Sequence, residues 1–212
     1  MSGYIGLLAA GFGLGVSVAA PLGPVSAAAI REGLERGALG TFRIGLGAAT
    51  VDFLYFGLVY VGVAPLLLRL PGLVVLFYVA GALLLGQMAY GALRRAAAGG
   101  LPKPAPPGTA RSAYLYGLGI TVLNPATIIS WLGMGGAFAS AYLRELAPLS
   151  GFGVLVAVFT GSVFWFGVLA LLVGGARRLA GERPWVFRLV NLVAGVALGG
   201  FAIIFMIKAV RG

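Results

Sequence analysis

The segment Pro21-Leu-Gly-Pro24 interrupts an apolar stretch that runs from about residue 4 to residue 30. Its two prolines cannot continue a regular helix, because each lacks an N–H group and each ring clashes with a carbonyl one turn earlier. The flanks, residues 11–20 and 25–30, contain no charged residue, which is not typical of a loop in water. A broken helix at membrane depth is tolerated where the freed backbone groups face protein or a wet cavity. The segment therefore predicts an interrupted membrane helix.

A second interruption, Asn124-Pro125, lies in the other half of the chain. Matching interruptions in two halves are the best indication from sequence of a transporter's binding site. We therefore expect a site between the two broken helices, near the middle of the membrane. The half-helix that begins at Pro24 would direct N–H groups and the positive end of its dipole at this site, which suits a carboxylate. The half-helix after Pro125 would do the same.

The composition indicates an integral membrane protein. Of the 212 residues, 60% are apolar and 9% are charged, whereas a soluble domain typically carries about 25% charged residues. The chain has no cysteine and no histidine, which excludes thiol redox chemistry, cysteine-ligated metals and imidazole acid–base catalysis. We therefore expect no enzyme, cofactor or bound metal. The net charge of +10 comes from basic residues between apolar segments, so we expect membrane lipid and not nucleic acid as a partner.

Six segments are long enough to cross a hydrocarbon core about 30 Å thick. They are residues 4–30, 39–64, 72–93, 112–141, 149–175 and 186–208. The expected fold class is an all-α integral membrane protein with six transmembrane helices, of which helices 1 and 4 are broken at Pro21–Pro24 and Asn124–Pro125. The first segment is longer than the apolar part of a signal peptide, so we interpret it as a retained helix.

The connections between these segments predict an orientation. Those after the first, third and fifth segments hold eleven basic residues, against four on the other side. The positive-inside rule then places the eleven in the cytoplasm and both termini outside. The prediction is a multi-pass protein of a prokaryotic inner membrane.

The two halves of the chain also resemble each other. Three matches occur in the same order: Pro24 with Pro125, residues 51–57 with 161–167, and residues 80–86 with 194–200. Because each half holds three spans, the second half must enter the membrane from the opposite side, as in the inverted repeats of secondary transporters. We therefore predict a first three-helix repeat at 1–93, a Pro/Gly-rich cytoplasmic linker at 94–111 and a second three-helix repeat at 112–212.

Asp52 is the one acidic residue well inside an expected span. The other acids lie in or beside connections: Glu32, Glu35, Glu145 and Glu182. A charged side chain at the bilayer centre costs about 3 kcal/mol, so it needs a reason to be there. Asp52 either carries a coupling proton or pairs with a cationic group of the substrate, or else it is structural, as an ion pair or a buried protonated carboxyl. Tyr55, one turn away, could form a pocket wall.

A polar stripe follows the fourth segment at spacings of three residues: Thr121, Asn124, Thr127 and Ser130. These side chains either line a cavity or form hydrogen bonds between helices, and the break favours the cavity for Asn124. The candidate substrate-binding residues are Pro21, Gly23, Pro24, Val25, Ser26, Asp52, Tyr55, Asn124, Pro125 and Thr127. Asp52 is also the candidate coupling residue.

These residues give the chain a resemblance to the lysine exporter (LysE) family of amino-acid exporters, which includes the homoserine/threonine and leucine exporters. The resemblance rests on Pro21–Pro24, Gly33-Leu-Glu-Arg-Gly37, Gly45, Gly47, Asp52 and Leu123-Asn-Pro-Ala-Thr-Ile-Ile-Ser-Trp131. The chain departs from the family pattern where Leu22 separates Pro21 from Gly23, at Val51 in place of a glycine, and at Ala126 in place of a polar or basic residue. The resemblance implies six spans in inverted repeats, proton-driven export of amino acids and a homodimer.

The prediction is therefore a secondary active transporter that exports amino acids or closely related small metabolites from the cytoplasm. Two alternatives remain. A divalent-cation exporter of the same superfamily would need several oxygen ligands around one ion. A non-transporting membrane scaffold would use the prolines as kinks and Asp52 as a structural group.

Overall fold

The computed structural model describes residues 2–21, 23–62, 71–98, 109–143, 148–180 and 183–211, and within these residues the regular structure is helical throughout. The helices are α1 (Ser2–Ala19), α2 (Pro24–Arg36), α3 (Ala38–Tyr60), α5 (Pro71–Ala98), α6 (Thr109–Val122), α7 (Pro125–Ser130), α8 (Gly136–Tyr142), α9 (Pro148–Ala180) and α10 (Pro184–Arg211). A π-helical turn, η1 (Trp131–Gly135), joins α7 to α8. The all-α fold class is confirmed for the described part of the chain.

Proline fixes where many of these helices begin. It is the first residue of α2, α5, α7, α9 and α10. At this position its missing N–H group costs nothing, because the first N–H groups of a helix have no partner within it, and its fixed φ suits the helix.

Both interruptions bend the chain. The axes of residues 3–19 and 24–36 form an angle of 78°, and those of residues 111–122 and 125–142 form an angle of 62°. Four other helices are long and apolar enough to cross a membrane alone, which makes six spans if each bent pair counts as one.

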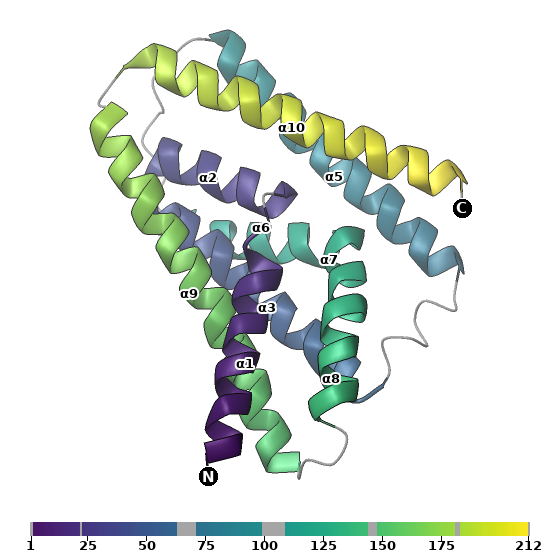
Figure 1. Cartoon of the computed structure of the whole chain (residues 1–212). Coiled ribbons are helices and arrows are strands. Elements are labelled where there is room, and N and C mark those ends of the chain that lie inside the picture. Colours follow the sequence, from purple (N-terminus) through teal and green to yellow (C-terminus); the bar gives the residue numbers. More distant parts are fainter. Residues whose placement is uncertain are drawn as a thin grey trace.

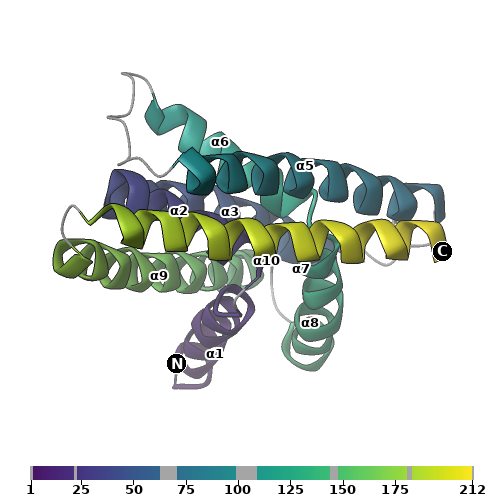
Figure 2. The ribbon, with the colours of Figure 1, turned by 90° about the horizontal axis from the view of Figure 1, so that it is seen from above.

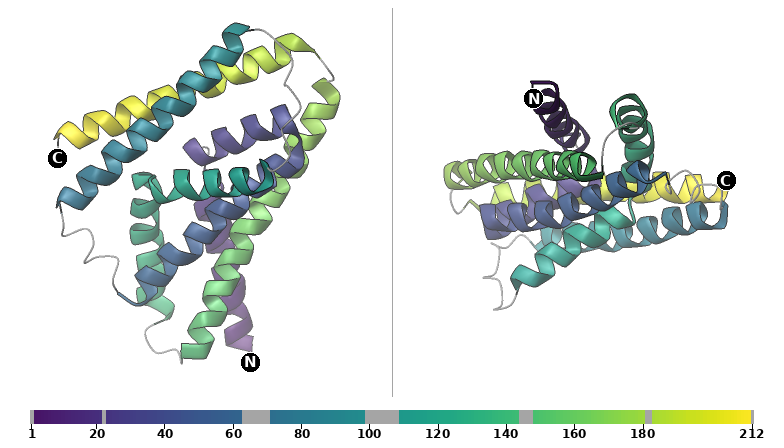
Figure 3. Two further views of the ribbon diagram at one scale, coloured as in Figure 1. Left: turned by 180° about the vertical axis from the view of Figure 1, so that it is seen from behind. Right: turned by 90° about the horizontal axis from the view of Figure 1, so that it is seen from below.

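The helices form three packed pairs (Figure 1). Helix α1 packs on α9, α6 packs on α3, and α5 packs along α10, while α3 and α9 cross at the centre. From above, α5 and α10 lie side by side over their length (Figure 2). Helices α2 and α6 lie across the middle of the molecule, as the view from behind shows (Figure 3).

Glycines allow two of these pairs to approach closely. A Cβ atom on Gly15 of α1 would lie 2.1 Å from the carbonyl oxygen of Val158 on α9, and one on Gly47 of α3 would lie 2.2 Å from that of Tyr114 on α6. A Cβ atom on Gly117 of α6 would lie 2.1 Å from the carbonyl oxygen of Ile44 on α3. Small residues at such crossings let membrane helices pack backbone against backbone.

The equivalent helices of the expected repeats run antiparallel. Gly45 of α3 faces Phe166, whereas Gly57, later in α3, faces Leu155, which is earlier in α9. In the same way, Gly81 of α5 faces Phe205 of α10, and Gly195 faces Leu93. Opposite chain directions in equivalent helices are what an inverted repeat requires.

The expected connection between the first two spans is wrong. Helix α2 continues to Arg36, and only Gly37, with a φ of 101°, separates it from α3. Glu32 and Glu35, expected in or beside a connection, are buried on α2. The physical reason is that Glu32 with Arg36, and Arg31 with Glu35, are four residues apart, which brings opposite charges together on a helix.

The expected linker at 94–111 is helical at both ends. Helix α5 continues to Ala98, and α6 begins at Thr109. Residues 99–108 lie outside the described residues, as do Glu145 and Glu182.

Candidate functional site

A cavity of about 160 Å³ lies where the two helix breaks meet. Its lining comes from most of the packed helices: Val18, Ala19, Pro21, Gly23, Pro24, Val25, Ser26, Ala48, Asp52, Thr121, Asn124, Ala126, Thr127, Ser130, Phe166 and Phe201. The whole polar stripe expected on the fourth segment reaches this cavity, which is consistent with a lining role for all four of its members.

Most of the candidate residues lie together around this cavity. They are Pro21, Gly23, Pro24, Val25, Ser26, Asp52, Asn124 and Thr127. Tyr55 and Pro125 are not in its lining. The Tyr55 hydroxyl donates a hydrogen bond of 2.7 Å to the carbonyl of Val122, the last residue of α6, and Pro125 is buried as the first residue of α7. Both residues therefore support the second break from outside the cavity.

Asp52 lines the cavity and is buried, with 4% of its surface exposed. The indole N–H of Trp131 donates a hydrogen bond of 2.8 Å to Asp52 Oδ1. The ring of Phe56 packs against the Trp131 ring, with the centroids 5.4 Å apart. Ser162 of α9, the residue that the expected repeat makes equivalent to Asp52, lies next to the carboxyl group, and its hydroxyl donates a hydrogen bond of 3.3 Å to the carbonyl of Gly15.

Trp131 was missed as a site residue. Its spacing carries the signal, because Asn124, Thr127 and Trp131 are three and four residues apart and so share one face of a helix. A tryptophan on the same face as two cavity-lining polar residues, opposite a buried acid, is a candidate hydrogen-bond donor to that acid.

The two half-helices begin differently. Asn124 caps α7, because its side-chain oxygen accepts from the backbone N–H of Ala126 at 3.2 Å and its amide donates to Thr127 Oγ1 at 2.8 Å. At the start of α2, the N-cap residue is Gly23, and no side chain caps the helix. Ser26 instead donates to the carbonyl of Pro21 at 3.2 Å. Among the two starts, the one at α2 therefore has the greater capacity to bind an anionic group.

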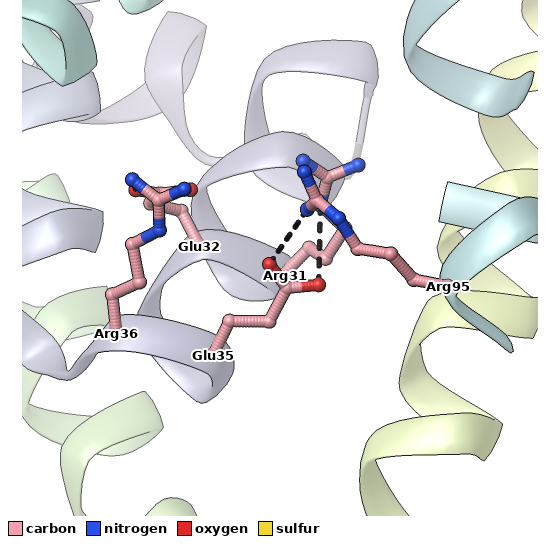
Figure 4. A network of polar contacts seen from close by, with 5 residues as sticks. All are labelled: Arg31, Glu32, Glu35, Arg36 and Arg95. Carbon is pink, nitrogen blue, oxygen red and sulfur yellow. Dashed lines mark hydrogen bonds and ion pairs between the residues drawn. The ribbon is translucent and has the colours of Figure 1, made fainter. Parts of the chain in front are cut away.

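A cluster of charged side chains lies away from the cavity, at the C-terminal end of α2 (Figure 4). Arg95 Nη1 of α5 donates to Glu35 Oε2 at 2.8 Å, and Arg31 Nε lies 3.8 Å from Glu35 Oε1. Arg36 and Glu32 form a neighbouring pair at 3.4 Å. Arg31 and Glu35 are more than nine-tenths buried. We call Arg31, Glu35 and Arg95 the α2–α5 ion cluster, because it joins the half-helix α2 to α5.

The acidic residues do not gather into a metal site. Within the described ranges, no three or more His, Cys, Asp or Glu residues lie close enough together to hold an ion. A divalent cation takes several oxygen ligands, and Asp52 is the one carboxylate among the described residues that line the cavity.

A bundle of membrane-length apolar helices, with a partly polar cavity at two helix breaks, is the architecture of a membrane transporter. The chain belongs to the LysE type translocator family, whose model matches residues 16–209, so the resemblance predicted from the sequence is confirmed. It is 29% identical over 210 residues to a protein of Bacillus subtilis (strain 168) named "Putative amino acid efflux protein YcgF"; the match covers 93% of this chain and 94% of that protein. No solved structure matches the chain. The protein is a multi-pass membrane translocator.

Proposed function

We propose that the protein exports amino acids, or closely related small metabolites, from the cytoplasm across a prokaryotic inner membrane by coupling to protons. The observation that carries this proposal is the cavity between the two breaks, with one buried carboxylate, Asp52, in its lining. Membership of a translocator family and the similarity to a protein named for amino acid efflux support export of this class of solute.

The proposal includes an inverted repeat, with the cavity near the middle of the membrane. In its support, Asp52 and Ser162, which the sequence match between the two halves pairs, lie next to each other where α3 packs on α9. A two-fold axis in the membrane plane would place equivalent residues together at such a crossing. Transporters of this kind move one set of helices against the other around a fixed site. The basic connections would face the cytoplasm, and both termini the outside.

Asp52 and the start of α2 would each bind one charged group of an amino acid. The ammonium group would approach Asp52, and the carboxylate would approach the uncapped start of α2 at Val25 and Ser26. Proton and ammonium then compete for one carboxylate, which links substrate release to proton binding. A proton that moves down a potential of 100 mV supplies about 2.3 kcal/mol, enough for a roughly fifty-fold concentration gradient.

Substitution of Asp52 by Asn tests this function. The amide keeps an oxygen for the Trp131 N–H group and the same shape, so we expect normal folding and insertion. Accumulation of substrate against its gradient, measured in liposomes with an imposed pH gradient, should be lost. Gln87→Leu, an exposed polar residue of α5 outside the cavity lining, is the control and should transport normally. Native accumulation by the Asp52→Asn variant would make the carboxyl structural and refute its coupling role.

The two alternative functions have less support. A cation exporter would need several carboxylates around the cavity, and Asp52 is the one carboxylate in its described lining. A scaffold would leave the cavity without a role, and it does not fit the membership of a translocator family.

A further inference from the structure

The cavity has a polar side and an apolar side. Its polar groups come from α2, α3, α6 and α7, whereas α1, α9 and α10 contribute only apolar residues to the lining, among them Phe166 and Phe201. Asp52 is the one charged side chain among the described lining residues. We propose that the substrate is a small neutral amino acid, whose side chain packs on the apolar side of the cavity. This inference rests on the exporter function proposed above.

The charges of the lining restrict the substrate. Trp131 uses one oxygen of the Asp52 carboxylate, and a carboxylate can accept about four hydrogen bonds, so it keeps capacity for one ammonium group. A basic amino acid would bring a second cation, and the described residues of the lining include no second carboxylate for it. An acidic amino acid would bring a second anion, and no lysine or arginine is among the lining residues that the structure describes. A buried charge without a partner is strongly disfavoured.

The volume of the cavity matches a small substrate. A closed protein cavity of about 150 Å³ binds benzene, which has about six non-hydrogen atoms. The cavity here has about the same volume, 160 Å³. Alanine, serine and threonine have about six to eight non-hydrogen atoms and fit this size, whereas phenylalanine and arginine have about twelve.

Thermal unfolding of the purified full chain in detergent, with a panel of amino acids, tests the substrate class. A molecule that binds only the folded protein raises the melting temperature, and a tighter ligand does so at a lower concentration. We expect alanine, serine or threonine to raise it at concentrations at least tenfold below those needed for lysine, glutamate or phenylalanine. Equal stabilisation by lysine or glutamate would refute the neutral class and leave amino acid export standing. No stabilisation by any amino acid would count against both proposals.

A pair of variants on α10 tests the position of the side chain. Phe201→Ala enlarges the apolar side of the cavity and should shift the preference toward leucine or phenylalanine by tenfold or more. Ile203→Ala, two residues further on and 63% exposed, removes a similar volume outside the cavity lining and should keep the native preference. Phe201→Leu is a milder variant if the alanine variant does not fold. An unchanged preference in a folded Phe201 variant would contradict the placement.

Discussion

Replacement of Gly15 by alanine should separate α1 from α9. The added Cβ atom would lie 2.1 Å from the Val158 carbonyl oxygen, whereas ordinary contacts begin at 3.4 Å. The obstacle is backbone and not a flexible side chain, so the helices must move apart by about 1.3 Å. Overpacking of this kind typically costs about 1–3 kcal/mol. We expect a loss of unfolding free energy in the upper half of this range, because the three atoms nearest the added Cβ all belong to the backbone of α9.

Gly13→Ala is the matched control on the same helix. A Cβ atom at Gly13 would meet nothing within 4 Å, and alanine favours a helix over glycine by up to about 1 kcal/mol. The unfolding free energies of the two variants should therefore differ by about 2–4 kcal/mol, because Gly15→Ala lowers this energy and Gly13→Ala raises it. Chemical unfolding of the purified protein in mixed micelles, followed by tryptophan fluorescence, measures this difference. Equal stability of the two variants would show that α1 does not pack on α9 through Gly15.

Two further variants test the buried polar contacts. Trp131→Phe keeps an aromatic ring but removes the N–H donor to Asp52. It should cost about 1–3 kcal/mol of unfolding free energy in the same assay. Trp185→Phe is the control, and it should cost little because Trp185 is 60% exposed. Arg95→Glu places a like charge beside Glu35 and should cost about 1–2 kcal/mol of unfolding free energy, less than for a fully buried pair because the Arg95 side chain is 48% exposed. Arg94→Glu, at an exposed residue, is its control and should cost little, and equal losses in the two variants would show that Arg95 does not pair with Glu35.

The features that could be predicted from the sequence are those that depend on residues close together in the chain. Proline cannot continue a helix, so the interruptions near Pro21 and Asn124 follow from backbone chemistry alone. The position of Asp52 within an apolar segment follows from hydropathy, since a charge at that depth is rare. The cavity residues of the first break and of the polar stripe were accordingly recognised.

The parts that were missed depend on contacts between distant segments. The helical spacing of Trp131 places it on the face of Asn124 and Thr127, but Asp52 is 79 residues away in the sequence, so only the packing of the helices identifies it as the acceptor. The α2–α5 ion cluster was missed because charged residues near the end of an apolar segment were interpreted as a connection. Glu35 and Arg95 neutralise each other only because α5 packs near the end of α2, so their burial is a consequence of tertiary packing.

The absence of a side chain at Gly135 leaves room for the Trp131 ring to reach Asp52. It ends the π-helical turn η1, and such turns occur frequently at functional sites. A Cβ atom on Gly135 would lie 2.9 Å from the Trp131 ring and 3.3 Å from that of Phe56. Because Phe56 is fully buried, the Trp131 ring would have to turn and lose its hydrogen bond of 2.8 Å to Asp52.

We therefore expect Gly135→Ala to reproduce the Trp131→Phe variant, with a similar loss of unfolding free energy and of gradient-driven transport. Gly136→Ala is the control on the next residue, where a Cβ atom would meet nothing within 4 Å, and it should leave both quantities near native. Combining Gly135→Ala with Trp131→Phe should cost little more than either alone, because both changes remove the same contact. Additive losses in this double variant would show that Gly135 acts independently of the contact between Trp131 and Asp52.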